Sequence, residues 1–187
     1  MRQLLEVLVT WLEAIRQVDF VAPLALRLYL APVFWMAGTN KLGAIGDIAM
    51  WFEHSLGLPM PTLMAWLAAL TETIGAVLLV LGLAMPLITI PLIITMLVAT
   101  FAVHWENGWA AIASSDNPEV AERLEAAKSI LKEHGNYDWL TAKGDFVILN
   151  NGVEFAVTYL IMLVVLFFFG AGRYVSVDYY IKRWLGR

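Results

Sequence analysis

Four apolar runs, each close to the length of a membrane-crossing helix, constrain this chain more than any other feature. They cover roughly residues 21–39, 61–83, 86–104 and 149–170. About 20 helical residues, rising about 1.5 Å each, cross a hydrocarbon core of about 30 Å. Loops and open strands cannot face lipid, because their backbone groups would lack hydrogen-bond partners. The sequence therefore predicts an all-α fold, a polytopic membrane protein built as a four-transmembrane-helix bundle.

The composition favours a single membrane domain over residues 1–187. Apolar residues make up 60% of the chain, whereas soluble domains are about 45–50% apolar. The net charge is −4 and no basic stretch alternates with aromatic residues, so we expect no nucleic-acid partner. The chain has no cysteine, which removes disulfides, thiolate metal sites and iron–sulfur ligation from consideration.

The segments outside the runs predict how the bundle is completed. Polar residues at helical spacing in Leu4–Phe20 indicate an amphipathic N-terminal helix, which either lies in the membrane interface or packs on the bundle as a soluble helix would. Loops 40–60 and 105–148 fall on the same side of the membrane and predict a cap over one end of the bundle. The second loop contains one short helix, because Asn117 is typical of an N-cap and Gly135 of a C-cap.

Charge placement gives the expected orientation. The tail, residues 172–187, mixes basic and aromatic residues, as interfacial anchors do. Lys and Arg are nearly equal in number on the two sides, but those nearest the runs lie on the side of the termini. The positive-inside rule therefore favours both termini in the cytoplasm.

Glu72 is the strongest candidate site residue, because a charge at bilayer depth costs roughly 3 kcal/mol or more. It lies near the middle of the second run, on one helical face with Ala65, Ala69 and Ala76. Small residues mark surfaces on which membrane helices approach closely. The carboxylate is therefore expected inside the bundle, either as a functional group or as a structural carboxyl that is hydrogen-bonded or ion-paired.

Arg27 is the second buried charge. It lies roughly 9 Å into the first run, on one face with Ala31, Phe34 and Gly38. An antiparallel second helix would place Glu72 about 6 Å deeper, within reach of an arginine side chain. The prediction is an Arg27–Glu72 pair that offsets the burial of both charges. The alternative is that Arg27 extends its side chain to the nearer membrane surface.

A second candidate site lies at the capped end of the bundle. Lys41, His104 and Glu154 reach this level from three different runs, beneath the predicted cap, and converging polar groups are a default hypothesis for a ligand site. The alternative is that Glu154 forms a capping box with Asn151. A haem needs two histidines that face each other and only His104 lies near a run, so no haem is expected. His104 with Glu106 is too small a set to predict a metal site.

Short segments in a fixed order resemble the DoxX family of four-helix integral membrane proteins. They are Leu26–Leu28, Phe34, Ala37–Gly38, Lys41–Leu42, Gly57–Pro59, Glu72 with Gly75, and Leu81–Gly82. The resemblance covers most of Leu24–Phe101, and the family takes its name from a membrane subunit of a thiosulfate–quinone oxidoreductase. This chain departs from the family pattern at Ala76, where a second glycine is common, and in its longer insertion between the third and fourth runs.

Two further segments, residues 104–109 and 172–178, resemble a bacterial subgroup associated with the maturation of ribosomally made, copper-binding peptides. This resemblance implies a multi-pass protein of the bacterial cytoplasmic (inner) membrane.

Three functions are compatible with these features. The first is a redox-linked or peptide-maturation accessory subunit that binds a quinone or a similar lipid-soluble ligand. Without haem or iron–sulfur ligands, it would need a soluble or membrane protein partner to supply electrons. The second is a non-catalytic scaffold or assembly factor, in which the buried charges fix helix register and the helix after Asn117 docks the partner. The third is a small transporter, which four spans without a repeat would support only as a homo-oligomer.

Overall fold

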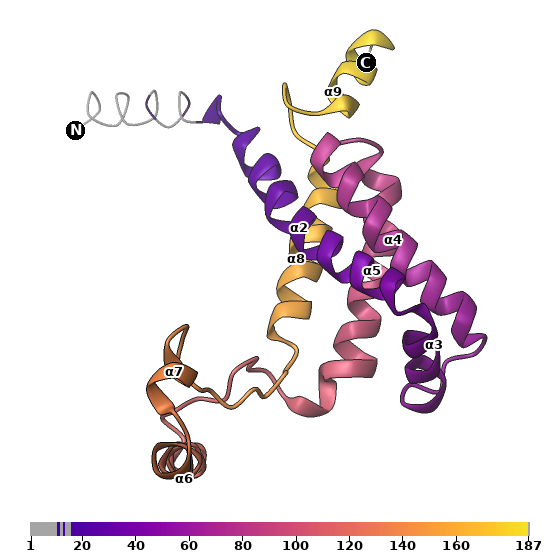
Figure 1. Cartoon of the computed structure of the whole chain (residues 1–187). Helices are drawn as coiled ribbons and strands as arrows, with labels where there is room; N and C mark the ends of the chain where they lie inside the picture. The colour runs from indigo at the N-terminus through magenta and orange to yellow at the C-terminus, as the bar shows by residue number, and fades with distance from the viewer. Residues whose placement is uncertain (1–10, 12, 14–15, 187) are drawn as a thin grey trace. The chain divides into compact units, whose positions relative to one another are not determined.

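The computed structural model describes Trp11, Glu13 and residues 16–186, which divide into two compact units (Figure 1). The first unit extends to Met96 and resumes at Tyr159, and the second is Leu97–Thr158. The helices in chain order are α2 (Val21–Gly43), α3 (Ile45–His54), α4 (Pro61–Leu81), α5 (Met85–Val98), the π-helical η1 (Ala99–His104), the 3-10 helix η2 (Trp105–Asn107), α6 (Pro118–His134), α7 (Tyr137–Thr141), α8 (Glu154–Phe169) and α9 (Val177–Trp184). The all-α class is confirmed for the described residues.

Among the described residues, three helical segments are long and apolar enough to cross a membrane: Val21–Gly43, Pro61–Leu81 and Met85–Asn107. The third combines α5, η1 and η2. The fourth predicted span, 149–170, is helical only as α8, whose 16 residues rise about 24 Å. That is shorter than the hydrocarbon core of about 30 Å. The chain is therefore a multi-pass helical membrane protein, and the fourth crossing stays a prediction.

Two segments predicted as loop or tail contain helices. In loop 40–60, α3 buries Ala49 and Phe52 against Ala65 of α4. Its apolar residues recur at helical spacing, but a pattern of ten residues is too short to distinguish a helix from a loop. In the tail, α9 begins with a cap from the Ser176 hydroxyl, which accepts a hydrogen bond from the backbone N–H of Tyr179.

The predicted helix in the second loop is confirmed as α6. The side chain of Asn117 accepts a hydrogen bond from the backbone N–H of Glu119, and Gly135 follows the last helical residue. Such a cap satisfies one of the amides that the first helical turn leaves without a partner. The predicted N-terminal helix, Leu4–Phe20, lies largely outside the described residues.

The core of the first unit is the packing of α2 against α4. The predicted small-residue faces are buried on both helices. A Cβ atom on Gly38 would lie 2.6 Å from the backbone nitrogen of Thr73 and would also meet its hydroxyl. Only glycine permits this approach. Close packing of this kind holds membrane helices together, because burying apolar surface from lipid gives little driving force.

Arg27 is not paired with Glu72, so that part of the prediction was wrong. Arg27 is 1% exposed, and within the described part of the chain its guanidinium donates to backbone carbonyls alone. The acceptors are the carbonyl oxygens of Leu79 (2.8 Å), Val80 (3.0 Å), Ala171 (2.6 Å) and Val175 (2.9 and 3.0 Å). The first two belong to the last turn of α4, where the carbonyl of Leu79 also accepts a hydrogen bond from the N–H of Gly82 and a positive charge complements the helix dipole. Helix depth alone does not reveal that the C-terminal segment returns to cover this arginine.

Two further residues complete this end of the bundle. Gly82 ends α4 with a φ of +62°, and a Cβ atom there would lie 2.5 Å from Nη1 of Arg27. The Asp178 carboxylate accepts hydrogen bonds from the first amides of α5, those of Ala84 (2.8 Å) and Met85 (3.0 Å). The backbone N–H of Asp178 donates to the carbonyl of Gly82 at 3.0 Å. The start of α9 is therefore an integral part of the fold.

We expect Gly38→Ala to destabilise the protein, because the new methyl group would force α2 and α4 apart. Overpacking of this kind costs about 1–3 kcal/mol. Unfolding in detergent, followed by circular dichroism, measures the loss. Gly43→Ala, in the same helix but with no atom within 4 Å of the added carbon, is the matched control. Equal stability of the two variants would contradict the close approach at Gly38.

Arg27→Met should release the C-terminal segment. Each buried carbonyl left without a donor costs about 1–3 kcal/mol, so the variant should lose at least about 3 kcal/mol. The stability of Arg27→Lys should lie between those of the wild type and Arg27→Met. An ammonium lacks the planar arrangement of donors by which a guanidinium reaches all of these carbonyls. Amide hydrogen exchange should accelerate over residues 171–178, whereas Arg123→Met, at an exposed position on α6, should leave this segment protected. A segment that stays protected in Arg27→Met would show that other contacts hold it.

Candidate functional site

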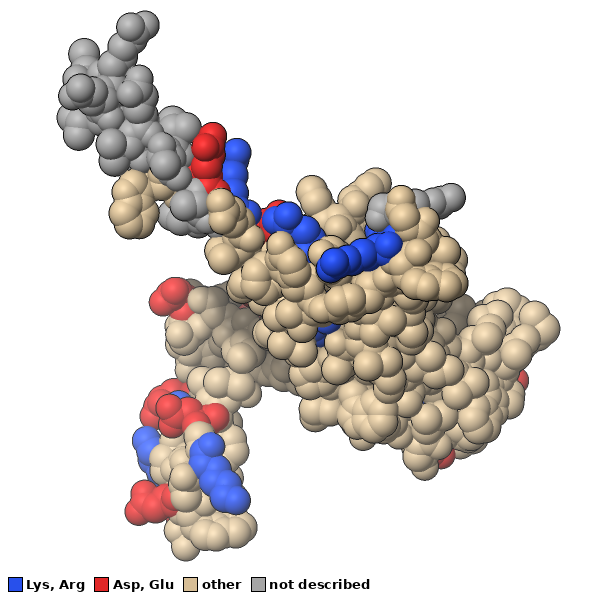
Figure 2. Space-filling model, turned by 90° about the horizontal axis from the view of Figure 1, so that it is seen from above, with Lys and Arg blue, Asp and Glu red and all other residues tan. Residues whose placement is uncertain are grey.

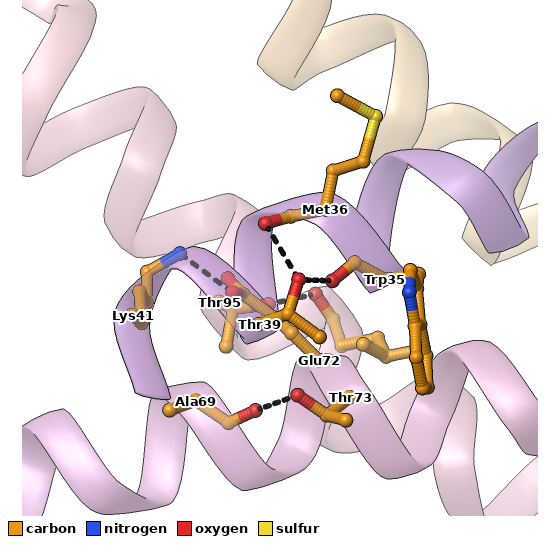
Figure 3. Close-up of polar contacts among 9 residues, drawn as sticks. Trp35, Met36, Thr39, Lys41, Ala69, Glu72, Thr73 and Thr95 are labelled. Atoms are coloured by element: carbon orange, nitrogen blue, oxygen red, sulfur yellow. Dashed lines mark hydrogen bonds and ion pairs between the residues drawn. The ribbon is translucent and has the colours of Figure 1, made fainter. Parts of the chain in front are cut away.

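The centre of the candidate site is an ion pair between Lys41 of α2 and Glu72 of α4 (Figure 3). Nζ of Lys41 lies 2.5 Å from Oε2 of Glu72. Glu72 stands about 16 Å from the start of α4, roughly half-way along that helix. Burying such a charge is costly unless a partner and hydrogen bonds compensate it. Lys41 supplies both.

The contact at Gly38 brings this pair together. Lys41 follows Gly38 by three residues, and Glu72 precedes Thr73, the residue that Gly38 touches. The point of closest backbone approach therefore sets the cation beside the carboxylate. The hydroxyl of Thr73 donates to the carbonyl of Ala69 at 2.8 Å, within its own helix. Figure 3 shows this bond apart from the one between Lys41 and Glu72.

The two members of the pair differ in exposure. The side chain of Lys41 is 22% exposed and that of Glu72 only 5%. An ammonium has three N–H donors and a carboxylate two acceptor oxygens, so the bond between them leaves further donors and one oxygen. Through Lys41, the pair can hydrogen-bond a carbonyl or hydroxyl group that approaches the exposed part of this side chain. It can also hold or pass a proton.

The other two predicted site residues stabilise the second unit. Nδ1 of His104 lies 2.9 Å from the carbonyl oxygen of Asn151, so this nitrogen is the donor. Oε2 of Glu154 accepts a hydrogen bond from the backbone N–H of Ala111 at 3.0 Å. The capping box of Glu154 with Asn151 is not formed, because the N–H of Asn151 donates to the carbonyl of Ala111. The convergence of His104 and Glu154 with Lys41 stays a prediction.

Both members of the pair were predicted as site residues, but the cation predicted to pair with Glu72 was Arg27, and the actual partner is Lys41. Lys41 lies on the same face of the first run as Arg27, and the register of the two helices decides which cation is nearer. Asp178, which caps α5, was missed because a capping carboxylate 94 residues away along the chain leaves no local pattern. Among the described residues, no three His, Cys, Asp or Glu side chains are grouped as metal ligands would be.

Comparison with protein families gives one match, to DoxX, over residues 22–105. Neither the curated proteins nor the solved structures gave a match. The matched residues run from α2 to the first residue of η2 and include Arg27, Lys41 and Glu72. The resemblance seen in the ordered segments of the sequence is confirmed. Residues 22–105 of this multi-pass membrane protein match the model of the DoxX family.

Proposed function

We propose that this chain is an accessory subunit of a redox-linked membrane reaction, and that its Lys41–Glu72 pair binds the polar head of a lipid-soluble carrier such as a quinone. The observation that carries the proposal is the ion pair itself: a lysine and a carboxylate joined half-way along a membrane helix, with the lysine still partly exposed. Ionisable groups at this depth are costly and typically mark ligand or proton pathways.

The pair suits a quinone head because its groups complement a carbonyl. The spare N–H donors of Lys41 would hydrogen-bond one carbonyl oxygen and orient the ring. Reduction of a quinone to a quinol takes up two electrons and two protons. Lys41 would donate one of these protons to the oxygen that it binds and would regain a proton from water through its exposed part, with Glu72 stabilising the restored ammonium. The second proton would reach the other quinone oxygen from water. The electrons must come from a partner protein, because the chain lacks cysteine and hence iron–sulfur ligands.

The DoxX match over residues 22–105 supports this proposal, since the family's name derives from a subunit of a quinone-linked enzyme. The proposal includes a bacterial inner-membrane location with both termini in the cytoplasm. A peptide-maturation complex would use the same pair if its partner delivers electrons to the membrane.

One observation favours a different role, a non-catalytic scaffold or assembly factor. The helix α6 buries none of its residues, and Ile130 on it is exposed. A solvent-facing helix of this length can dock a partner protein. In that case the Lys41–Glu72 pair would only fix the register of α2 and α4.

A charge exchange separates the two roles. Purified wild-type protein should retain quinone, measured by mass spectrometry of its lipid extract, and should bind a short-chain quinone in detergent. Glu72→Gln and Lys41→Gln should weaken that binding about 10- to 100-fold, the range for loss of a hydrogen bond to a charged group. The double variant Lys41→Glu/Glu72→Lys restores an ion pair with reversed polarity. It should regain thermal stability but not quinone binding.

The control is Glu53→Gln, at an exposed carboxylate on α3, which should bind as wild type does. If the double variant recovers quinone binding together with thermal stability, the pair serves only to fix the register of α2 and α4. The scaffold role is then the one supported. If the wild-type protein neither retains nor binds a quinone, the proposed function is wrong whatever the variants do.

A further inference from the structure

The short helix α9 begins at the level of a membrane surface. The 21 residues of α4 rise about 32 Å, which matches a hydrocarbon core of about 30 Å, so each end of α4 lies at an interface. The first turn of α9 is attached to one of these ends. Asp178 donates its N–H to the carbonyl of Gly82, immediately after α4, and its carboxylate caps α5. Its depth is therefore set by hydrogen bonds rather than by a flexible linker.

One side of α9 is an uncovered apolar stripe. Four large apolar residues recur at positions i, i+3, i+4 and i+7, the spacing of one helical face, and all are exposed, Trp184 at 85%. They are Val177, Tyr180, Ile181 and Trp184. A helix with such a stripe, attached at an interface, places it in the boundary between headgroups and acyl chains.

Aromatic rings continue along the same end of the first unit. Phe20 contacts Tyr174 at 5.4 Å between ring centroids, Tyr174 contacts Tyr179 at 5.5 Å, and Tyr179 contacts Tyr180 at 5.3 Å. Tyrosine and tryptophan concentrate at membrane–water interfaces, where an apolar ring and a polar tip are both accommodated. This row of rings agrees with the level assigned to α9 from its hydrogen bonds.

The basic residues of α9 are available for an anionic partner. Asp19 binds Arg173 at 2.7 Å, and the hydrogen bond and charge of Asp19 raise the pKa of that guanidinium. The two opposite charges therefore offset each other. The carboxylate of Asp178 is already engaged with α5. Neither acid is thus available to Lys182 or Arg183, which are exposed at the end of α9. Figure 2 looks onto this end, where Lys and Arg side chains gather.

We infer that α9 is an interfacial helix that lies on one membrane leaflet and binds the headgroups of anionic phospholipids through Lys182 and Arg183. The apolar stripe supplies attachment to any bilayer, and the two cations supply the preference for anionic lipid. A protein partner would match the charges equally well, but it would not account for the depth of α9 or the row of aromatic rings. This inference is independent of the role of Lys41 and Glu72.

The test is amide hydrogen exchange over residues 177–186 of the full-length protein in nanodiscs. One set contains phosphatidylcholine alone, and the other contains phosphatidylcholine with phosphatidylglycerol. Juxtamembrane Lys and Arg each contribute to anionic-lipid binding, and together they should slow exchange about 30-fold in the anionic nanodiscs. High salt should remove most of this difference, because it screens the attraction.

Variants isolate the cause. Lys182→Gln/Arg183→Gln should abolish the difference between the two nanodiscs, whereas Lys182→Arg/Arg183→Lys should keep it. Arg123→Gln/Lys128→Gln, with the same loss of charge on α6, should also keep it. Equal exchange rates of the wild type in the two nanodiscs would contradict the preference for anionic lipid. Fast exchange in both would contradict the attachment of α9 to the bilayer. A difference that survives in Lys182→Gln/Arg183→Gln would equally overturn the assignment to these two residues.

Discussion

The guanidinium of Arg27 holds together three parts of the chain that are far apart in the sequence. It donates to carbonyls at the end of α4 and to carbonyls that follow α8, while its own backbone belongs to α2. The guanidinium is buried within the protein, and this single cation supplies hydrogen-bond donors to several backbone groups at once. The glycine that ends α4 and the aspartate that caps α5 both lie around it. This end of the first unit is therefore a polar network with an arginine at its centre.

The candidate site is built by a different principle, namely backbone proximity. Gly38 allows α2 and α4 to touch, and that contact places a lysine against a carboxylate part-way down the membrane. Arg27 has its hydrogen bonds satisfied by fixed carbonyls, whereas Lys41 keeps donors that are not engaged by Glu72. The two cations of α2 thus have different surroundings: Arg27 is buried among backbone carbonyls, whereas Lys41 is partly exposed beside Glu72. The sequence places both on one face and does not distinguish them.

Much of the fold follows from the sequence alone, because apolar runs near 20 residues long can only be helices in lipid. The caps of α6 were equally predictable, since Asn117 and Gly135 act locally. The partner of Glu72 and the cap formed by Asp178 were not predicted correctly because the residues that decide them lie far apart along the chain. Glu72 was joined to the wrong cation because helix register depends on Gly38, and Asp178 was missed because its partners lie 93 and 94 residues away. Short amphipathic helices such as α3 were missed because ten residues carry too little periodicity.

The reach of Arg27 has a consequence for how the protein is made. The arginine and the carbonyl of Val175 that it binds are 148 residues apart, so α2 leaves the ribosome long before its last acceptor exists. Once α4 is made, the carbonyls of Leu79 and Val80 can accept hydrogen bonds from the guanidinium. Its remaining N–H groups need water or headgroups until residues 171–175 exist. The hydrogen bonds of a residue near the start of α2 are therefore completed only after α8 has been synthesised.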